Sequence, residues 1–116
     1  MLSLPEPDAI RLRHMLDAAR EALSFVKGVS ERSFGGDRRL VLSLVKEVEI
    51  IGEAAGRVSP AARQQLQDIP WQKIVGMRNH LIHAYFDVDL NLLWDTITID
   101  LPPLSSALEA ALRDSR

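Results

Sequence analysis

The segment RNHLIHAY, residues 78–85, gathers an arginine, an asparagine, two histidines and a tyrosine within eight positions. Histidine gives and takes protons near neutral pH, because its ordinary pKa is about 6.5. Arginine holds a phosphate through paired donors while charge develops on the phosphate oxygens. Arg78 and His83 therefore indicate metal-independent cleavage of RNA, in which the 2'-hydroxyl attacks the adjacent phosphorus, and Asn79 would orient either partner. DNA lacks that hydroxyl and would not be cut.

Each of these residues also has an ordinary structural interpretation. A lone histidine near a helix end is more often a cap or a surface group than a catalyst, and a lone Arg78 is more often a solvated charge. Tyr85 would ordinarily lie at the edge of the core. His80 and His83 are close enough in sequence to share a metal ion, but no third ligand stands at a recognisable spacing. No metal or other cofactor is predicted, and the residues alone leave the choice between a nuclease site and a structural role open.

The backbone must bring the arginine and the histidine together. On a straight helix each residue turns about 100°, so Asn79 and His83 share a face, whereas Arg78 and His83 are about 140° apart. Asp87 indicates that the helix ends soon afterwards, which places His83 and Tyr85 in or beyond its last turn. Local unwinding there would let both side chains converge with Arg78 beside an accessible pocket.

Two long amphipathic helices are predicted in the first half of the chain. The stretch PEPD at residues 5–8 is a start signal, and the apolar residues after it recur at three- and four-residue steps until a stop near Gly28. Residues 30–39 have the composition of a connection, and Asp37 is predicted to cap the next helix. One stripe of that second helix carries Val41, Leu44, Val45, Val48, Gly52 and Ala55.

Small residues cluster at the end of the second helix. The cluster consists of Gly52, Ala54, Ala55 and Gly56. A glycine costs up to about 1 kcal/mol in a helix interior, so the close approach of another helix is the expected compensation. A tight contact is therefore predicted here, within the subunit or across a dimer. Glu53 is expected to be solvated, with a pairing to Arg78 or to a residue across the dimer as the other option.

The second half of the chain is also predicted to be helical. Ser59 caps a short helix that runs through Gln67, and a further helix covers residues 71–85. A last helix begins near Leu90 and is kinked by the pair Pro102–Pro103. No stretch alternates convincingly with a period of two. The chain is therefore predicted to be all-α, an antiparallel bundle of four or five helices in a single domain over 1–116.

The composition limits the class of protein. The net charge of −2 excludes a general polyanion binder, so any contact with nucleic acid must be local. The chain has no cysteine, which excludes disulfides and thiolate metal sites. No apolar run is long enough for a signal peptide or for a membrane span, and the cytoplasm is the expected location.

Three segments carry a recognisable pattern: IIGEAAGRVS (50–59), IPWQKIVGMRNHLIHAYFDVD (69–89) and LWDTITIDLPPL (93–104). They resemble the HepT-like branch of the HEPN-domain family. The most specific element is an arginine, four residues, a histidine, one residue and a tyrosine, which is intact here as Arg78, His83 and Tyr85. Asn79 also fits, because HEPN nucleases commonly carry a polar residue directly after the arginine.

The resemblance implies a small helical endoribonuclease, the toxin of a bacterial toxin–antitoxin pair, with Arg78, Asn79 and His83 as catalytic residues and tRNA or mRNA as substrate. It also implies a partner, an MntA-like nucleotidyltransferase antitoxin that transfers AMP from ATP onto the motif tyrosine, here Tyr85. The family typically forms homodimers, with higher assemblies as a further option, in which two motifs face one cleft. Two copies of Arg78 would then form a local basic groove on an acidic protein.

Two other interpretations stay open. In the first, the protein is a non-catalytic helical partner whose motif binds a nucleotide or only accepts AMP from the nucleotidyltransferase. In the second, it is a structural dimer with a degenerate site. The nuclease and the AMP acceptor differ in one property, which is whether the free, unmodified protein cuts RNA.

Overall fold

The structure is built almost entirely of helices. The computed structural model describes residues 4–84 and 87–114, apart from the side chains of residues 83 and 84. In chain order the elements are α1 (Glu6–Val26), α2 (Glu31–Phe34), α3 (Arg38–Gly56), α4 (Pro60–Gln65), α5 (Trp71–Val75), α6 (Met77–Leu81), β1 (Ile82–Ala84), β2 (Asp87–Val88), α7 (Leu90–Asp95), the π-helix η1 (Thr96–Asp100) and α8 (Leu101–Asp114). The predicted all-α class is confirmed.

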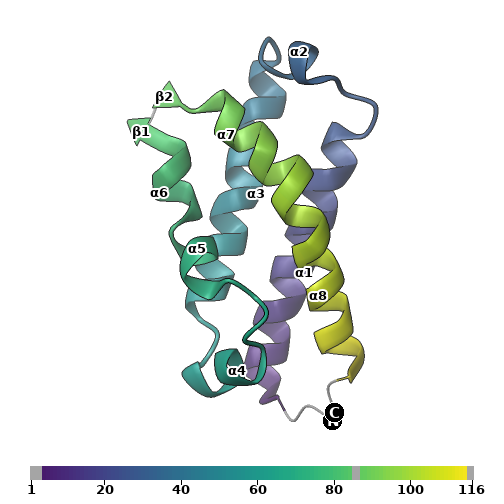
Figure 1. Ribbon diagram of the computed structural model, residues 1–116, viewed down its shortest axis with the longest axis vertical. Coiled ribbons are helices and arrows are strands. Elements are labelled where there is room, and N and C mark those ends of the chain that lie inside the picture. Colours follow the sequence, from purple (N-terminus) through teal and green to yellow (C-terminus); the bar gives the residue numbers. More distant parts are fainter. Residues whose placement is uncertain (1–3, 85–86, 115–116) are drawn as a thin grey trace.

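The helices run alternately up and down an elongated bundle that measures 45 × 29 × 19 Å (Figure 1). α1 and α3 pack against each other along the long axis, and α8 lies against α1. α5 and α6 run along α3 to the β1–β2 hairpin, and α7 then returns through η1 into α8. The start of α1 and the end of α8 therefore lie at one end of the bundle, and the hairpin lies at the other.

Local sequence signals set the limits of the long helices. The backbone N–H of Leu40 donates to Asp37 Oδ1 at 3.1 Å, which confirms the predicted cap of α3. α1 ends at Val26, and Gly28 follows with φ +78°, a left-handed conformation that glycine adopts without a steric penalty. The predicted stripe of α3 faces the core, because Val41, Leu44, Val45, Val48 and Ala55 are all buried.

A buried carboxylate ties the start of α1 to the start of α4. Asp8, only 4% exposed, accepts hydrogen bonds from the backbone N–H of Ser59 at 2.8 Å and from its hydroxyl at 2.7 Å. The Ser59 oxygen in turn accepts from the N–H of Ala62, so the predicted cap is confirmed. The helix that it opens is shorter than predicted, since α4 ends at Gln65 and not at Gln67.

The predicted helix over residues 71–85 is wrong in two places. It breaks at Gly76, which closes α5 and opens α6, and it ends at Leu81. The chain then forms a short antiparallel hairpin in which Ile82 pairs with Val88, and the N–H of Asp89 donates to the Leu81 carbonyl at 2.8 Å. Ile82 and Val88 are β-branched and half-buried, which suits a strand that packs on a core.

The proline pair perturbs the last helix without ending it. Pro102 and Pro103 lie in the first turn of α8, and the π turn of η1 directly precedes them. Within that turn the N–H of Leu101 donates to the Thr96 carbonyl, five residues back. Because proline lacks an N–H and crowds the preceding turn, the wider π spacing accommodates the pair, and the kink of the helix axis stays a prediction.

Glu47 is a carboxyl group buried at the contact between α1 and α3. Its side chain is 4% exposed, and it forms a side-chain hydrogen bond with Glu21 of α1. Burial is the largest cause that raises the pKa of Glu47 to about 7, followed by the hydrogen bond and by the charge of Glu21. The folded protein therefore retains a proton that the unfolded chain, with an ordinary pKa of 4.5, releases.

This proton makes the stability depend on pH. The pKa of Glu47 is higher in the folded protein than in the unfolded chain. The free energy of unfolding therefore falls as the pH rises from 4.5 through about 7. We expect Glu47→Gln to stabilise the protein relative to wild type by on the order of 1–2 kcal/mol at pH 8, less than the shift alone implies because solvent screens the Glu21 side of the pair. At pH 4.5 the two proteins should differ little.

Urea unfolding of both proteins at the two pH values measures this difference. Glu21→Gln serves as a second variant, since removing its charge should weaken the pH dependence without abolishing it. An equal effect of Glu47→Gln at both pH values would contradict the raised pKa.

Candidate functional site

The helix α6 presents the first part of the motif to solvent. Met77 and Leu81 are buried and anchor one face of this helix, while Arg78, Asn79 and His80 are exposed on the other. The short helix α5 before it is fixed to the core by Trp71 and Ile74, which are also buried. The position of Arg78 thus depends on how closely α5 and α6 approach α3.

Gly52 sets the distance of that approach. A Cβ atom on Gly52 would lie 3.3 Å from the carbonyl oxygen of Ile74 and 3.6 Å from that of Val75. Both atoms belong to the backbone of α5, so they cannot move aside as the end of a flexible side chain would. The predicted close contact at Gly52 is confirmed, and it lies within the subunit.

Arg78 is paired with an acid that the sequence did not single out. Its Nε donates to Glu49 Oε1 at 3.1 Å, and the side chains are 48% and 33% exposed. Glu53, one helical turn further on, pairs with Arg57 of its own helix at 3.1 Å and is well exposed, as expected. The one sequence feature that could have indicated Glu49 as a partner of Arg78 is its position one helical turn before Glu53 on α3. Which of the two acids pairs with Arg78 depends on the position along α3 at which α6 packs against it.

Arg78 and Asn79 form part of a shallow, open hollow of about 340 Å³. The other residues that line it are Glu49, Gly52, Glu53 and Val75. The structure thus brings Arg78 and Asn79 to one solvent-accessible surface. Among the described residues that line this hollow, Arg78 is the cation and Glu49 and Glu53 are the acids.

The backbone of His83 lies in the hairpin and not in a helix. Its backbone belongs to β1, so the separation of about 140° expected on a straight helix does not apply. The predicted unwinding after the arginine is confirmed, since α6 ends at Leu81. The side chain of His83 and the whole of Tyr85 lie outside the described residues, and their convergence with Arg78 stays a prediction.

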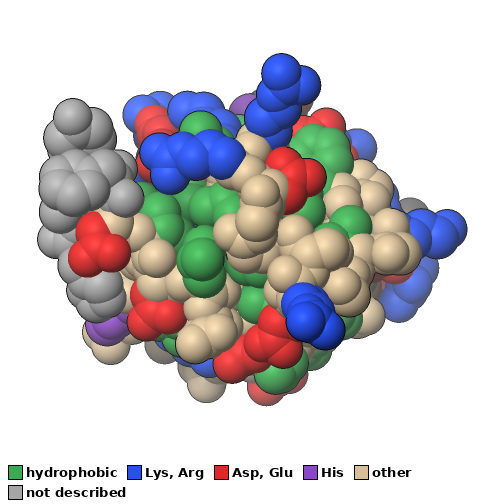
Figure 2. Space-filling model, turned by 90° about the horizontal axis from the view of Figure 1, so that it is seen from above, with side chains coloured by type: hydrophobic (Ala, Val, Ile, Leu, Met, Phe, Trp, Pro, Cys, Tyr) green, Lys and Arg blue, Asp and Glu red, His purple; other side chains and the backbone are tan. Residues whose placement is uncertain are grey.

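The surface around the hairpin end carries charges of both signs. Figure 2 shows this end, with cationic and acidic side chains interspersed among apolar ones and no broad basic field. Exposed apolar residues at this end include Leu42 of α3 and Leu90 of α7. Any attraction of a polyanion must therefore come from individual groups such as Arg78.

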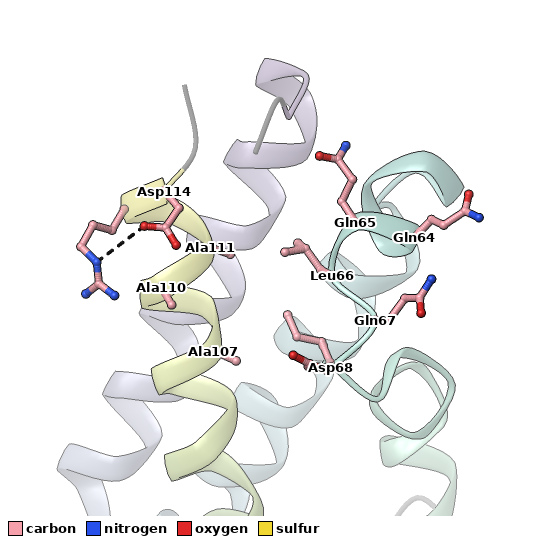
Figure 3. A pocket seen from close by; sticks show the side chains of 11 residues that line it. Gln64, Gln65, Leu66, Gln67, Asp68, Ala107, Ala110, Ala111 and Asp114 are labelled. Atoms are coloured by element: carbon pink, nitrogen blue, oxygen red, sulfur yellow. Dashed lines mark ion pairs between the residues drawn. The ribbon is translucent and has the colours of Figure 1, made fainter. Parts of the chain in front are cut away.

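A larger hollow, of about 860 Å³, lies at the other end of the molecule. It separates α8 from residues 64–69, and Figure 3 shows Leu66 and Asp68 extending toward the alanines of α8. Gln64 and Gln67 extend away from α8 (Figure 3), and Arg113 pairs with Asp114 at 3.9 Å. This larger hollow contains none of the motif residues, so the size of a hollow alone does not identify the functional site.

The described part of the chain offers no group of three or more histidine, aspartate or glutamate side chains that could hold a metal ion. None of the described helices is both long enough and apolar enough to cross a membrane.

Comparison with known proteins identifies the family. Residues 15–111 match the family described as "Ribonuclease HepT-like", which covers most of the chain. The chain belongs to the HepT-like family. A "Putative RNase" of Caldanaerobacter subterraneus subsp. tengcongensis is 34% identical to this HepT-like chain over 90% of it and 94% of the relative. A "Probable ribonuclease HepT" of Thermococcus cleftensis is 32% identical over 84% of the chain and 89% of the relative.

A "Putative RNase" of Methanocaldococcus jannaschii is likewise 32% identical, over 84% of the chain and 90% of the relative. The matches span nearly the full length of these relatives, so the HepT-like chain is similar to whole proteins and not to a fragment of them. No significant match was found among solved structures.

The contact at Gly52 predicts different effects for two glycines of α3. Gly56→Ala should stabilise the protein by up to about 0.5 kcal/mol, because alanine favours a helix, Gly56 is the last residue of α3 and a Cβ there would meet nothing within 4 Å. Gly52→Ala should lose that gain and destabilise by about 1 kcal/mol, because its Cβ would push the backbone of α5 away from α3.

Urea unfolding of both variants measures the energies, and the Nε–H signal of Arg78 in NMR spectra reports its position. We expect this signal to shift in Gly52→Ala and to stay in place in Gly56→Ala. Equal stabilisation by the two substitutions would show that the approach of α5 is not constrained at Gly52.

Proposed function

We propose that this protein is an endoribonuclease that cleaves RNA without a metal ion. The observation that carries the proposal is the family match over residues 15–111, which includes the complete motif of Arg78, His83 and Tyr85. The relatives named above as ribonucleases support it. So does the place of Arg78, exposed on an open hollow and able to meet a phosphate from solvent.

The proposed reaction is an internal transfer of the phosphodiester. His83 takes the proton of the 2'-hydroxyl, whose oxygen attacks the adjacent phosphorus, and the bond to the 5'-oxygen breaks. A proton passes to that leaving oxygen, so the products are a 2',3'-cyclic phosphate and a 5'-hydroxyl. Arg78 binds the non-bridging oxygens as negative charge develops on them, and Asn79 orients the histidine or the phosphate.

The protein acts as a homodimer in this proposal, with two motifs facing one cleft. A dimer would bring two copies of Arg78 to one cleft, together with two copies of the acids that line each hollow. Val75, which is 42% exposed on the wall of the hollow, is an apolar residue next to the motif that a second copy would cover.

The proposed biological role is that of a toxin held in check by an MntA-like nucleotidyltransferase antitoxin. This partner transfers AMP from ATP to the hydroxyl of Tyr85, with release of pyrophosphate. Each AMP adds bulk and a negative phosphate two residues from His83, and both oppose the entry of an RNA backbone. The modification would therefore inactivate the enzyme without unfolding it.

Cleavage of RNA by the purified protein tests the enzymatic proposal. In EDTA, wild type should cut single-stranded RNA and leave DNA of the same sequence intact. Arg78→Ala and His83→Ala should each lower the rate by at least about a hundredfold, since each removes a group that acts in the transition state. His80→Ala is the matched control and should retain activity, because His80 lies outside the motif.

Intact RNA with unmodified wild-type protein would overturn the nuclease and favour the non-catalytic AMP acceptor. Equal losses in His80→Ala and His83→Ala would point to a general loss of structure, which circular dichroism of each variant would detect.

Tyr85→Phe separates cleavage from neutralisation. The variant should cut RNA at a rate within about threefold of wild type, because the hydroxyl takes no part in the proposed transfer. After incubation with the nucleotidyltransferase and ATP, wild type should gain adenylyl mass and lose activity, whereas Tyr85→Phe should do neither. Modification of Tyr85→Phe at another residue, detected by mass spectrometry, would contradict the assignment.

A further inference from the structure

We propose that Glu49 is a positioning residue for the cleavage reaction, because it fixes the guanidinium of Arg78 by its Nε and leaves the terminal nitrogens free for the substrate phosphate. The inference rests on the proposed function. It assigns a role to a residue outside the motif, on a helix that the motif does not include.

The contact uses the one nitrogen of Arg78 that phosphate binding does not need. Nε carries one of the five N–H donors of an arginine, and it donates to Glu49 Oε1 at 3.1 Å. Among the described residues, Glu49 is the one partner of Arg78. The two terminal nitrogens thus keep the planar fork that binds two phosphate oxygens at once.

The two partners are carried by elements of different rigidity. Glu49 belongs to α3, a helix of 19 residues, and lies beside Val48, which is 1% exposed in the core. Arg78 belongs to α6, which has only five residues and leads directly into the hairpin. A long arginine side chain on such a short element loses much rotamer freedom when it binds. The contact with α3 fixes part of that freedom before the substrate arrives.

The contribution of the Glu49–Arg78 ion pair to folding stability is too small to explain why the pair is present. Its two side chains are 48% and 33% exposed, and ion pairs at such positions contribute little to folding because water and salt screen them. The charge of Glu49 is also unfavourable to RNA, since this acid lines the same hollow as Arg78. Glu49 therefore has two opposite effects, which are repulsion of the polyanion and orientation of the arginine.

Glu53 offers a control that separates these effects. It lies on the same helix and lines the same hollow, but it pairs with Arg57 and not with Arg78. Replacing either glutamate removes one negative charge from the hollow. Only the replacement of Glu49 releases the guanidinium of Arg78.

Steady-state cleavage of a short single-stranded RNA measures the difference. We expect Glu49→Ala to lower kcat by about tenfold or more without raising KM, because the arginine is misplaced while repulsion is reduced. Glu49→Gln should recover most of kcat, because its amide oxygen still accepts from Nε. Glu53→Ala and Glu53→Gln should keep kcat within about twofold of wild type.

A kcat for Glu49→Ala as high as that of Glu53→Ala would overturn the inference. So would a rise in KM at unchanged kcat, which indicates that Glu49 helps only to bind RNA.

The side chain of Arg78 provides a readout that does not depend on cleavage. In the free protein, NMR relaxation of the Arg78 Nε–H should show an ordered side chain in wild type and in Glu53→Ala, and a mobile one in Glu49→Ala. If RNA is not cut but this order depends on Glu49, the proposed function fails and the contact stands. If RNA is cut and the order is the same in all proteins, the positioning role is wrong and the nuclease stands.

Discussion

The absence of a side chain at Gly52 is the constraint on which the site depends. The carbonyl oxygens of Ile74 and Val75 occupy the place that a Cβ would fill, so α5 lies directly against α3. α6 follows directly after Gly76, and Arg78 pairs with Glu49, about one turn before Gly52 on α3. A larger residue at position 52 would displace the arginine and its acid relative to each other, because it would push α5 away from α3.

Much of the fold follows from local signals in the sequence. Asp37 and Ser59 cap the helices that they were predicted to cap, because a short polar side chain before a periodic apolar run satisfies free N–H groups wherever that run packs. The stripe of α3 was also predictable, since helical spacing alone decides which residues share a face. The small residue at Gly52 indicated close approach, but it did not reveal which helix would approach.

The parts that were missed depend on pairings and contacts that the helical spacing of apolar residues does not show. The break at Gly76 and the hairpin after Leu81 interrupt a stretch whose apolar spacing suits one helix, and the pairing of Ile82 with Val88 decides against it. The π turn before Pro102 depends on how the prolines fit the helix that precedes them. Glu49 was missed for the same reason, because its partner is 29 residues away in sequence.

The two ends of the bundle, here called its poles, are separated by about the length of its longest helices. α1 starts and α8 finishes at the pole opposite the β1–β2 hairpin, across a molecule 45 Å long (Figure 1). A fluorescent label, an affinity tag or a surface tether joined to either terminus is thus carried far from the RNHLIHAY segment. Attachment through either end therefore leaves the exposed surface of Arg78 and Asn79 at the opposite pole uncovered.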